Sequence, residues 1–193
     1  KNGSSIYVPD GGYKNFGWDN SPPEPEYFKQ LFRVSKNQII WGANYFDYPM
    51  AGGMIIWDKC NDGSDQSDAE IAFNSLTRRV DIFRYMWRGM FQGKSIAEGT
   101  IQQGNKKLNE KRIHPTQKPV NLYRWICQKY LQKGMKILDT HVGSASSLIA
   151  YEEYGLEYIG YEINEDYYND ACKRLEEFRS QITLFDLGME EHK

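Results

Sequence analysis

Cysteine is scarce in this sequence, which has only three among its 193 residues. Cys60, Cys127 and Cys172 lie far apart and form no Cys-x-x-Cys pair. An odd, scattered set argues against both a disulfide framework and a cysteine-based zinc site, and it fits a reducing cytoplasm.

Long apolar runs and a strong charge of one sign are also missing. No run approaches the roughly 18 apolar residues of a transmembrane helix, and the first ten residues lack the apolar stretch of a signal peptide. The net charge of −2 excludes a wholly basic nucleic-acid coat but leaves room for a local basic face. We therefore expect no membrane partner.

Aromatic side chains are abundant, at 15% of the residues. The length suits a single domain over 1–193, and the apolar periodicity predicts a mixture of helices and strands. The predicted helices are 26–35, 119–131, 146–154 and 165–178, and the predicted strands are 38–41, 55–58, 71–74, 80–85, 136–139 and 158–162. Residues 1–23 and 87–113 are predicted to be loops, and Leu184 and Phe185 to form a last strand.

The strongest local signal is a strand, a turn, a helix and a second strand between residues 136 and 162. Gly143 would let the turn approach a ligand closely, and the helix start at Ser146 offers free N–H groups. Glu162, at the end of the second strand, could accept hydrogen bonds from two ribose hydroxyls. The pattern predicts a nucleotide-type cofactor site; a structural glycine beside a solvated glutamate is the alternative.

The composition of this turn narrows the choice of cofactor. A dinucleotide usually requires three spaced glycines, and this turn has Gly143 in that role alone. No Gly-Lys-Ser/Thr phosphate loop occurs. S-adenosylmethionine has a ribose but no phosphate, so a less glycine-rich turn followed by a carboxylate suits it, and Asp139 could face its cationic amino group.

A second segment carries a family resemblance. His114-Pro-Thr-Gln-Lys-Pro119 stands directly before a predicted amphipathic helix, and Ile-Leu-Asp139 follows that helix. The combination resembles the C-terminal half of the beta-class amino-group DNA methyltransferases, including short phage and prophage members. The resemblance implies an α/β three-layer sandwich with a mostly parallel sheet, the Rossmann-like fold of S-adenosylmethionine-dependent methyltransferases in a permuted motif order.

The resemblance also implies a set of residues around S-adenosylmethionine, in a pocket that Lys118, Asp139 and Glu162 would share. Thr140, His141 and Ala145 stand where the family has Pro, Phe and Gly, which puts the contact normally made by the Phe in doubt. The implied cofactor-binding residues are His114, Pro115, Thr116, Gln117, Lys118, Pro119, Asp139, Thr140, His141, Gly143, Ser144, Ala145, Ser146 and Glu162.

The family's catalytic tetrapeptide, Asp/Asn/Ser-Pro-Pro-aromatic, has no match. The nearest sequence is Ser21-Pro22-Pro23-Glu24, whose Glu cannot stack on a flipped base. We expect the catalytic strand and tetrapeptide to precede Lys1 in a longer protein, so the catalytic residues stay unknown. The absence of a Pro-Cys nucleophile excludes cytosine C5 methylation.

The resemblance implies transfer to the exocyclic amine of adenine (N6) in double-stranded DNA. Cytosine N4, an inactive DNA-binding relative and a nucleotide-dependent oxidoreductase stay open as alternatives. The stretch 86–113 is basic and stands where the family has its target-recognition region, although a solvated surface would look similar. The candidate DNA-binding residues are Asn44, Arg84, Arg88, Lys94, Lys111 and Arg112.

Other partners and settings follow from the same resemblance. His114 and His141 have no further ligand at metal-binding spacing, so no metal is predicted. A homodimer stays open. A role in restriction-modification in the cytoplasm of a bacterial or phage-infected cell is the expected setting.

Overall fold

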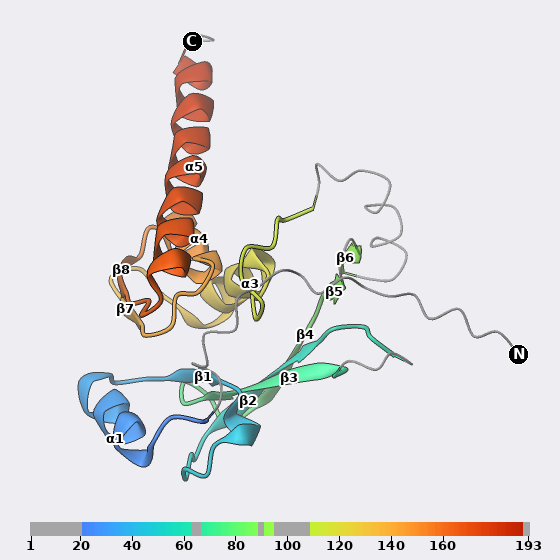
Figure 1. The fold of residues 1–193 in the computed structure, drawn as a ribbon, viewed down its shortest axis with the longest axis vertical. Coiled ribbons are helices and arrows are strands. Elements are labelled where there is room, and N and C mark those ends of the chain that lie inside the picture. Colours follow the sequence, from blue (N-terminus) through green and yellow to red (C-terminus); the bar gives the residue numbers. More distant parts are fainter. Residues whose placement is uncertain (1–20, 63–66, 89–90, 95–108, 191–193) are drawn as a thin grey trace, which may run out of the picture.

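A computed structural model describes residues 21–62, 67–88, 91–94 and 109–190 (Figure 1). The strands are β1 (Ile39–Trp41), β2 (Gly53–Asp58), β3 (Ala69–Asn74), β4 (Val80–Arg84), β5 (Met86–Arg88), β6 (Phe91–Gly93), β7 (Lys136–Asp139) and β8 (Glu157–Gly160). The helices are α1 (Pro25–Val34), the short 3-10 helix η1 (Ala43–Tyr45), α3 (Val120–Tyr130), α4 (Ser146–Glu153) and α5 (Glu165–Glu190).

The first four strands form one sheet in the order β1-β3-β2-β4. β3 pairs antiparallel with both β1 and β2, and β4 pairs parallel with β2. The prediction of a mostly parallel sheet was therefore wrong for these strands. The reason is local: β3 follows β2 after a short connection and folds back beside it, which only antiparallel pairing allows.

Helices cover both faces of this sheet. Ile55, Trp57 and Ala72 form a buried cluster with Leu122 and Ile126 of α3. The next residue of β3, Phe73, points to the opposite face because side chains alternate along a strand. There its ring lies 6.3 Å from that of Phe32 in α1. The helix–sheet–helix layers that the sequence implied are thus present.

A parallel pair of strands, β7 and β8, flanks the second core, and α4 connects them. Leu148, Ile149 and Tyr151 of α4 pack there with Leu175 of α5. Gly160 at the end of β8 has no room for a side chain, since a Cβ atom would lie 2.6 Å from Cγ2 of Val142. The predicted strand–turn–helix–strand unit is confirmed, with its boundaries within one or two residues.

Two sequence predictions failed in detail. β5 and β6 pair antiparallel inside the stretch predicted as a loop, because strands of three residues are too short to show periodicity. The last strand predicted around Leu184 and Phe185 is instead the end of α5, which continues to Glu190 and extends away from the rest of the molecule (Figure 1). The predicted loop over 1–23 falls mostly on residues outside the described ranges.

No helix within the described residues is both long enough and apolar enough to cross a membrane.

Candidate functional site

The turn after β7 is held by side chains that the sequence singled out. The carboxylate of Asp139 accepts hydrogen bonds from the backbone N–H of His141 at 3.1 Å and from Oγ of Ser147 at 2.5 Å. Oγ1 of Thr140 lies 3.0 Å from Nδ1 of His141 and 2.8 Å from the hydroxyl of Tyr27 in α1. Asp139 therefore fixes the end of its strand to the start of α4.

Glu162, two residues after the end of β8, holds the same turn from the other side. Its Oε2 accepts a hydrogen bond from the N–H of Gly143 at 2.8 Å, and its Oε1 accepts one from the N–H of Asn164 at 3.0 Å. Each carboxylate oxygen has a second acceptor position, so the group keeps capacity for hydroxyl donors. Gly143 has a φ of +54°, in the left-handed region that glycine adopts without strain.

The first turn of α4 begins from an unusual residue. Ala145, which precedes the helix, also lies in the left-handed region, with a φ of +61°, and no side chain caps the helix. An L-residue with a Cβ is strained in that conformation by about 1–2 kcal/mol. The N-terminus of α4, which carries the positive end of the helix dipole, therefore follows directly on the turn that Glu162 holds through Gly143.

His114 brings the second motif to this turn. Its ring lies 4.2 Å from the ring of Tyr167 and 3.7 Å from the position that a Cβ on Gly143 would take. Nδ1 of His114 accepts a hydrogen bond from the N–H of Thr116 at 3.2 Å. Burial lowers the pKa of His114, opposed by the negative charge of Glu162 and assisted by the positive charge of Lys118. The imidazole is thus kept neutral between the two charged groups.

Lys118 faces a different partner from the one expected. Its Nζ lies 3.0 Å from Oε2 of Glu70 in β3 and 5.5 Å from the centre of the Trp41 ring. Lys59 approaches the other oxygen of Glu70 at 2.7 Å. Burial raises the pKa of the Glu70 carboxyl, but the two ammonium groups outweigh burial and hold that pKa below its ordinary value.

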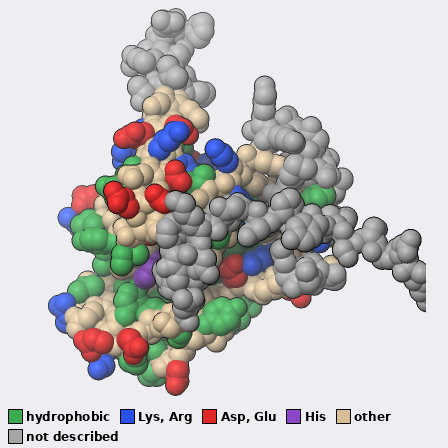
Figure 2. Space-filling model, viewed as in Figure 1, with side chains coloured by type: hydrophobic (Ala, Val, Ile, Leu, Met, Phe, Trp, Pro, Cys, Tyr) green, Lys and Arg blue, Asp and Glu red, His purple; other side chains and the backbone are tan. Residues whose placement is uncertain are grey.

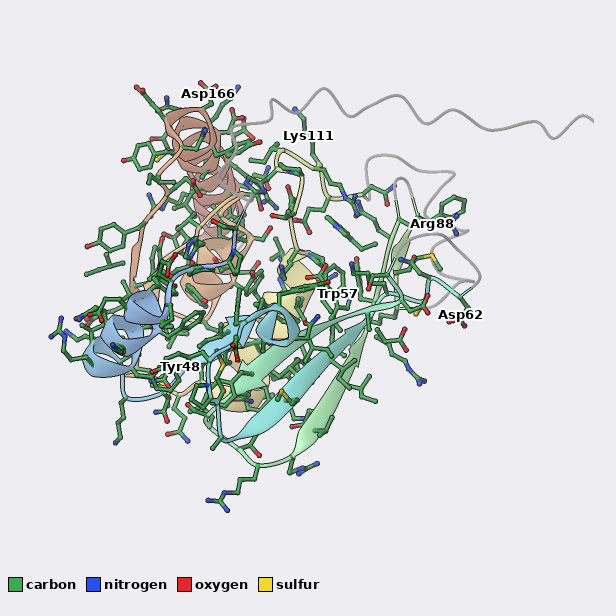
Figure 3. The ribbon with its side chains drawn as sticks, turned by 60° about the horizontal axis from the view of Figure 1, so that its bottom comes forward. Tyr48, Trp57, Asp62, Arg88, Lys111 and Asp166 are labelled. Carbon is green, nitrogen blue, oxygen red and sulfur yellow. The ribbon has the colours of Figure 1, made fainter. Side chains whose placement is uncertain are left out.

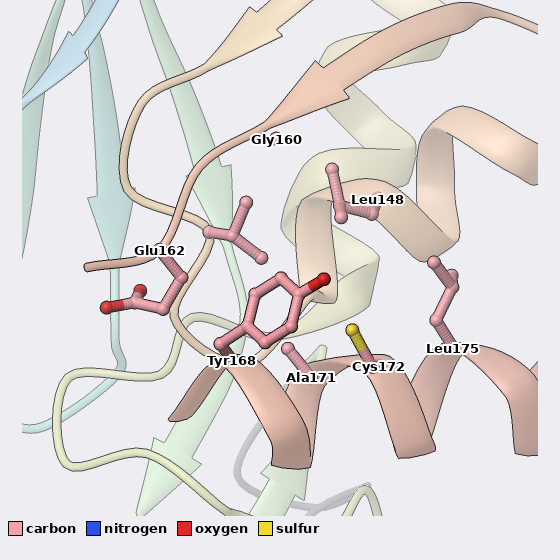
Figure 4. Close-up of a pocket in the computed structure, with 8 residues that line it drawn as sticks. Leu148, Gly160, Glu162, Tyr168, Ala171, Cys172 and Leu175 are labelled. Atoms are coloured by element: carbon pink, nitrogen blue, oxygen red, sulfur yellow. The ribbon is translucent and has the colours of Figure 1, made fainter. Parts of the chain in front are cut away.

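A mostly apolar hollow opens beside Glu162 (Figure 4). Glu162 is on its wall, whereas Asp139 and Lys118 are not. Within the described residues, this hollow contains one of the three side chains that we expected to share a pocket; Lys118 pairs with Glu70, and Asp139 accepts a hydrogen bond from Ser147. The lining residues are Val142, Leu148, Gly160, Glu162, Tyr168, Ala171, Cys172 and Leu175.

The predicted cofactor residues differ in accessibility. His114, Gln117, Pro119, Ser144, Ala145 and Ser146 are buried, Lys118, Asp139, Thr140, Gly143 and Glu162 are half-buried, and Pro115, Thr116 and His141 are exposed. They lie on three segments: residues 114–119 and 139–146 meet at the contact between His114 and Gly143, and Glu162 joins them through its hydrogen bond with Gly143.

The predicted DNA-binding residues form no such cluster. Arg112 stacks on Trp87, with its guanidinium carbon 4.7 Å from the ring centre, and donates to the Trp87 carbonyl at 2.5 Å. Arg84 pairs with Asp58 at 3.0 Å. The remaining four, Asn44, Arg88, Lys94 and Lys111, are exposed.

These exposed residues lie on separate segments. Figure 3 shows Arg88 on β5 and Lys111 on the chain leading to α3. On the face drawn in Figure 2, basic and acidic side chains are interspersed. On this face the described basic side chains thus stand at separate positions.

Sequence reasoning missed the acidic residues that organise the site. Glu70 bridges two lysines, and the side chain of Glu110, which stood out only as a negative charge in a basic stretch, accepts four hydrogen bonds. Neither glutamate belongs to a motif, so only the tertiary contacts reveal them.

No group of His, Cys, Asp and Glu within the described ranges is arranged to hold a metal ion. The three cysteines are free thiols.

These features define a class: an α/β protein with a glycine-bearing turn between two parallel strands, against which the segment from His114 to Lys118 packs. Residues 56–173 match the model of a DNA methylase family, that of the N6/N4 methyltransferases. The match covers more than half of the chain, and the chain belongs to this family.

Individual relatives agree with the family. The chain is 26% identical over 169 residues to the type II methyltransferase M2.DpnII of Streptococcus pneumoniae, covering 84% of this chain and 50% of that protein. It is 32% identical over 99 residues to the type II methyltransferase M.HindIII of Haemophilus influenzae, covering 45% and 31%. The chain thus spans about half the length, or less, of these curated relatives.

Among solved structures, the M1.HpyAVI–SAM complex aligns over 63% of this chain and 60% of its own, with 22% identity and a TM-score of 0.42.

Proposed function

We propose that the chain is the cofactor-binding part of a DNA methyltransferase that transfers a methyl group from S-adenosylmethionine to N6 of adenine. One observation carries the proposal: the two sequence motifs are in contact. The His114 segment packs against Gly143, and the N–H of Gly143 donates a hydrogen bond to Glu162. Family membership supports the reaction class. Adenine is preferred to cytosine because N6 is the more frequent target in the family that the motifs resemble.

The residues present fit S-adenosylmethionine. A ribose needs an acceptor for two hydroxyls, which Glu162 offers, and the backbone N–H of Gly143 donates to the same carboxylate at 2.8 Å. The hollow beside Glu162 offers apolar surface for a purine ring. Bound there, the cofactor would supply an electrophilic methyl group, and the residues from His114 to Pro119 would form the opposite wall. Asp139 would accept the cationic amino group.

Double-stranded DNA is the proposed substrate, with 86–113 as a small target-recognition segment. Arg88, Lys94, Lys111 and Asn44 are the residues we propose to contact it, since all four are exposed. Arg84 and Arg112 are weaker candidates, because each already has an acidic or carbonyl partner within the fold.

We further propose that the chain forms one domain whose catalytic strand and Asp/Asn/Ser-Pro-Pro-aromatic tetrapeptide lie elsewhere in the full-length protein. The length of the relatives supports this proposal, since M2.DpnII is about twice as long as the segment it shares with this chain. A homodimer, a cytoplasmic location in a bacterial or phage-infected cell and a role in restriction-modification complete the proposal.

The test uses the full-length protein, unmethylated double-stranded DNA and S-adenosylmethionine with a labelled methyl group. Digestion of the DNA to nucleosides and mass spectrometry should give labelled N6-methyl-2′-deoxyadenosine. Labelled N4-methyl-2′-deoxycytidine would show that cytosine, not adenine, is the target base. Absence of any labelled base, with DNA binding retained, would identify an inactive DNA-binding relative instead.

A further inference from the structure

The side chain of Glu110, outside the two motifs, accepts hydrogen bonds from four different residues. Its Oε1 accepts hydrogen bonds from Nε2 of Gln117 at 2.9 Å, from Nη2 of Arg174 at 2.5 Å and from Oγ of Ser146 at 3.3 Å. Its Oε2 accepts one from the backbone N–H of Val120 at 2.9 Å. One carboxylate therefore joins the His114 segment, the starts of α3 and α4, and α5.

The ion pair at the centre of this cluster is largely shielded from water. The side chains of Arg174 and Glu110 are 15% and 20% exposed. The guanidinium also donates through Nη1 to the carbonyl oxygen of Ser144 at 2.6 Å and to Oγ of Ser146 at 3.0 Å. Charge-assisted hydrogen bonds of this kind are about twice as strong as neutral ones. The pair thus holds the turn before α4 rigidly relative to α5.

Gln117 transmits the position of Glu110 to the motif. While its Nε2 donates to Glu110, its Oε1 accepts from the N–H of Ile113 at 2.8 Å, directly before His114. Gln117 is 6% exposed, and its Nε2 also donates to the carbonyl oxygen of Lys111 at 3.1 Å, so losing Glu110 would leave one of its two buried amide N–H groups without this acceptor. The backbone around His114 is therefore set by the location of the Glu110 carboxylate.

The same residue is tied to the β5–β6 hairpin through its backbone. The side-chain amide of Gln92 donates to the carbonyl oxygen of Glu110 and accepts from its N–H, both at 2.8 Å. Trp87 of β5 donates its indole N–H to the carbonyl oxygen of Gln117 at 2.9 Å. In Figure 1 the segment before α3 lies between α5 and this hairpin, as these bonds require.

We propose that Glu110 is a positioning residue for the cofactor site. It touches none of the groups assigned to the cofactor contact at Gly143 and Glu162, and it acts through Gln117 and Ser146, which lie on the two sides of that contact. The inference rests on the proposed function, because it takes the turn at Gly143 and Glu162, against which His114 packs, as the place where S-adenosylmethionine binds. A carboxylate is required because its four donors include a guanidinium and a helix N-terminus.

The test compares Glu110→Gln with wild type and with Glu177→Gln, the same chemical change at an exposed position of α5. The amide of the new Gln side chain places an NH2 donor where the Glu110 carboxylate now accepts hydrogen bonds, so at least one of these hydrogen bonds is lost. The affinity for S-adenosylhomocysteine, measured by calorimetry, should fall by about 10-fold or more, as misplaced binding groups do. Glu177→Gln should leave it unchanged.

A second readout separates positioning from general stability. The indole N–H of Trp87 reports on the carbonyl of Gln117, and Glu110 does not touch that indole. Its signal in a proton–nitrogen correlation spectrum, assigned with Trp87→Phe, should shift in Glu110→Gln and stay fixed in Glu177→Gln. If Glu110→Gln does not fold, Arg174→Lys replaces it, since the shorter ammonium cannot reach Glu110, Ser144 and Ser146 together.

An unchanged Trp87 signal in a folded Glu110 or Arg174 variant would overturn the positioning role. A wild-type protein that binds no S-adenosylhomocysteine would overturn the proposed function instead, and the Trp87 signal would still decide the role of Glu110.

Discussion

The cofactor side and the DNA side of the candidate site are built in different ways. On the cofactor side, His114, Gly143 and Glu162 come from three segments and contact one another in sequence. On the DNA side, Arg88 and Lys111 are exposed on separate segments, and Arg112 is held by Trp87. The motifs therefore predicted residues that lie next to one another in the structure. The basic stretch, in contrast, contains both exposed residues and residues such as Arg112 that contribute to the fold.

The largest effect is expected for a substitution that removes the proposed ribose acceptor on the cofactor side. Glu162→Ala should weaken binding of S-adenosylhomocysteine by about 1–3 kcal/mol, because the ribose loses its acceptor and the N–H of Gly143 loses a partner. Calorimetry measures the change. Glu162→Gln, which keeps an acceptor oxygen, should lose less affinity for S-adenosylhomocysteine than Glu162→Ala. Equal affinity in wild type and Glu162→Ala would remove Glu162 from the site.

Arg112→Met tests whether this arginine belongs to the fold rather than to the DNA surface. The change removes a hydrogen bond from a charged donor and a cation–π contact with Trp87, so unfolding in urea should require about 2 kcal/mol less free energy. Arg88→Met, at an exposed position of the neighbouring strand, should leave the unfolding free energy within about 0.5 kcal/mol of wild type. If both substitutions change the free energy of unfolding equally little, Arg112 does not stabilise the fold and is a candidate for DNA contact again.

For DNA binding, Arg88→Met should have a larger effect than Arg112→Met, the reverse of their effects on stability. With the full-length protein, Arg88→Met should lower the slope of log affinity against log salt by about 0.9, the share of one phosphate contact. Filter binding or fluorescence anisotropy over a range of salt concentrations gives the slope. A folded Arg88→Met protein with the wild-type slope would remove Arg88 from the DNA surface.

The pH dependence of stability probes the neutral state of His114. Burial lowers its pKa in the folded protein below the ordinary value of 6.5. As the pH falls through that value, the unfolded chain takes up the proton more readily, so the free energy of unfolding should decrease. Above that value neither state holds the proton, and the contribution vanishes.

Urea unfolding between roughly pH 7.5 and pH 5.5 measures this contribution. His114→Gln should show a shallower decrease, since the variant has no imidazole to protonate. The same slope in both proteins would contradict a buried, neutral His114.

The smallest expected effect concerns the turn itself. Ala145→Gly relieves about 1–2 kcal/mol of backbone strain but removes a buried methyl group worth about 0.8 kcal/mol. We expect a net gain in unfolding free energy of up to about 1 kcal/mol, measured by urea unfolding. A loss of stability would show that the methyl group outweighs the strained backbone.

These comparisons also explain what the sequence could predict. Asp139, Gly143 and Glu162 lie on one strand–turn–helix–strand unit, so local spacing was enough to relate them. The pair of Glu110 and Arg174 is separated by 64 residues, and no local pattern links them. Lys118 belonged to a recognised motif, yet its partner Glu70 lies on β3, so its motif gave no indication of the ion pair. The short β5 and β6 strands were missed because three residues carry no measurable period.

The most direct measurement is a crystal structure of the protein with S-adenosylhomocysteine. We expect the ribose hydroxyls to lie within hydrogen-bonding distance of the Glu162 carboxylate, with the backbone of Gly143 against the ligand and His114 on the opposite side. A ligand bound elsewhere, with Glu162 making no contact to it, would contradict the assignment of this turn as the cofactor site.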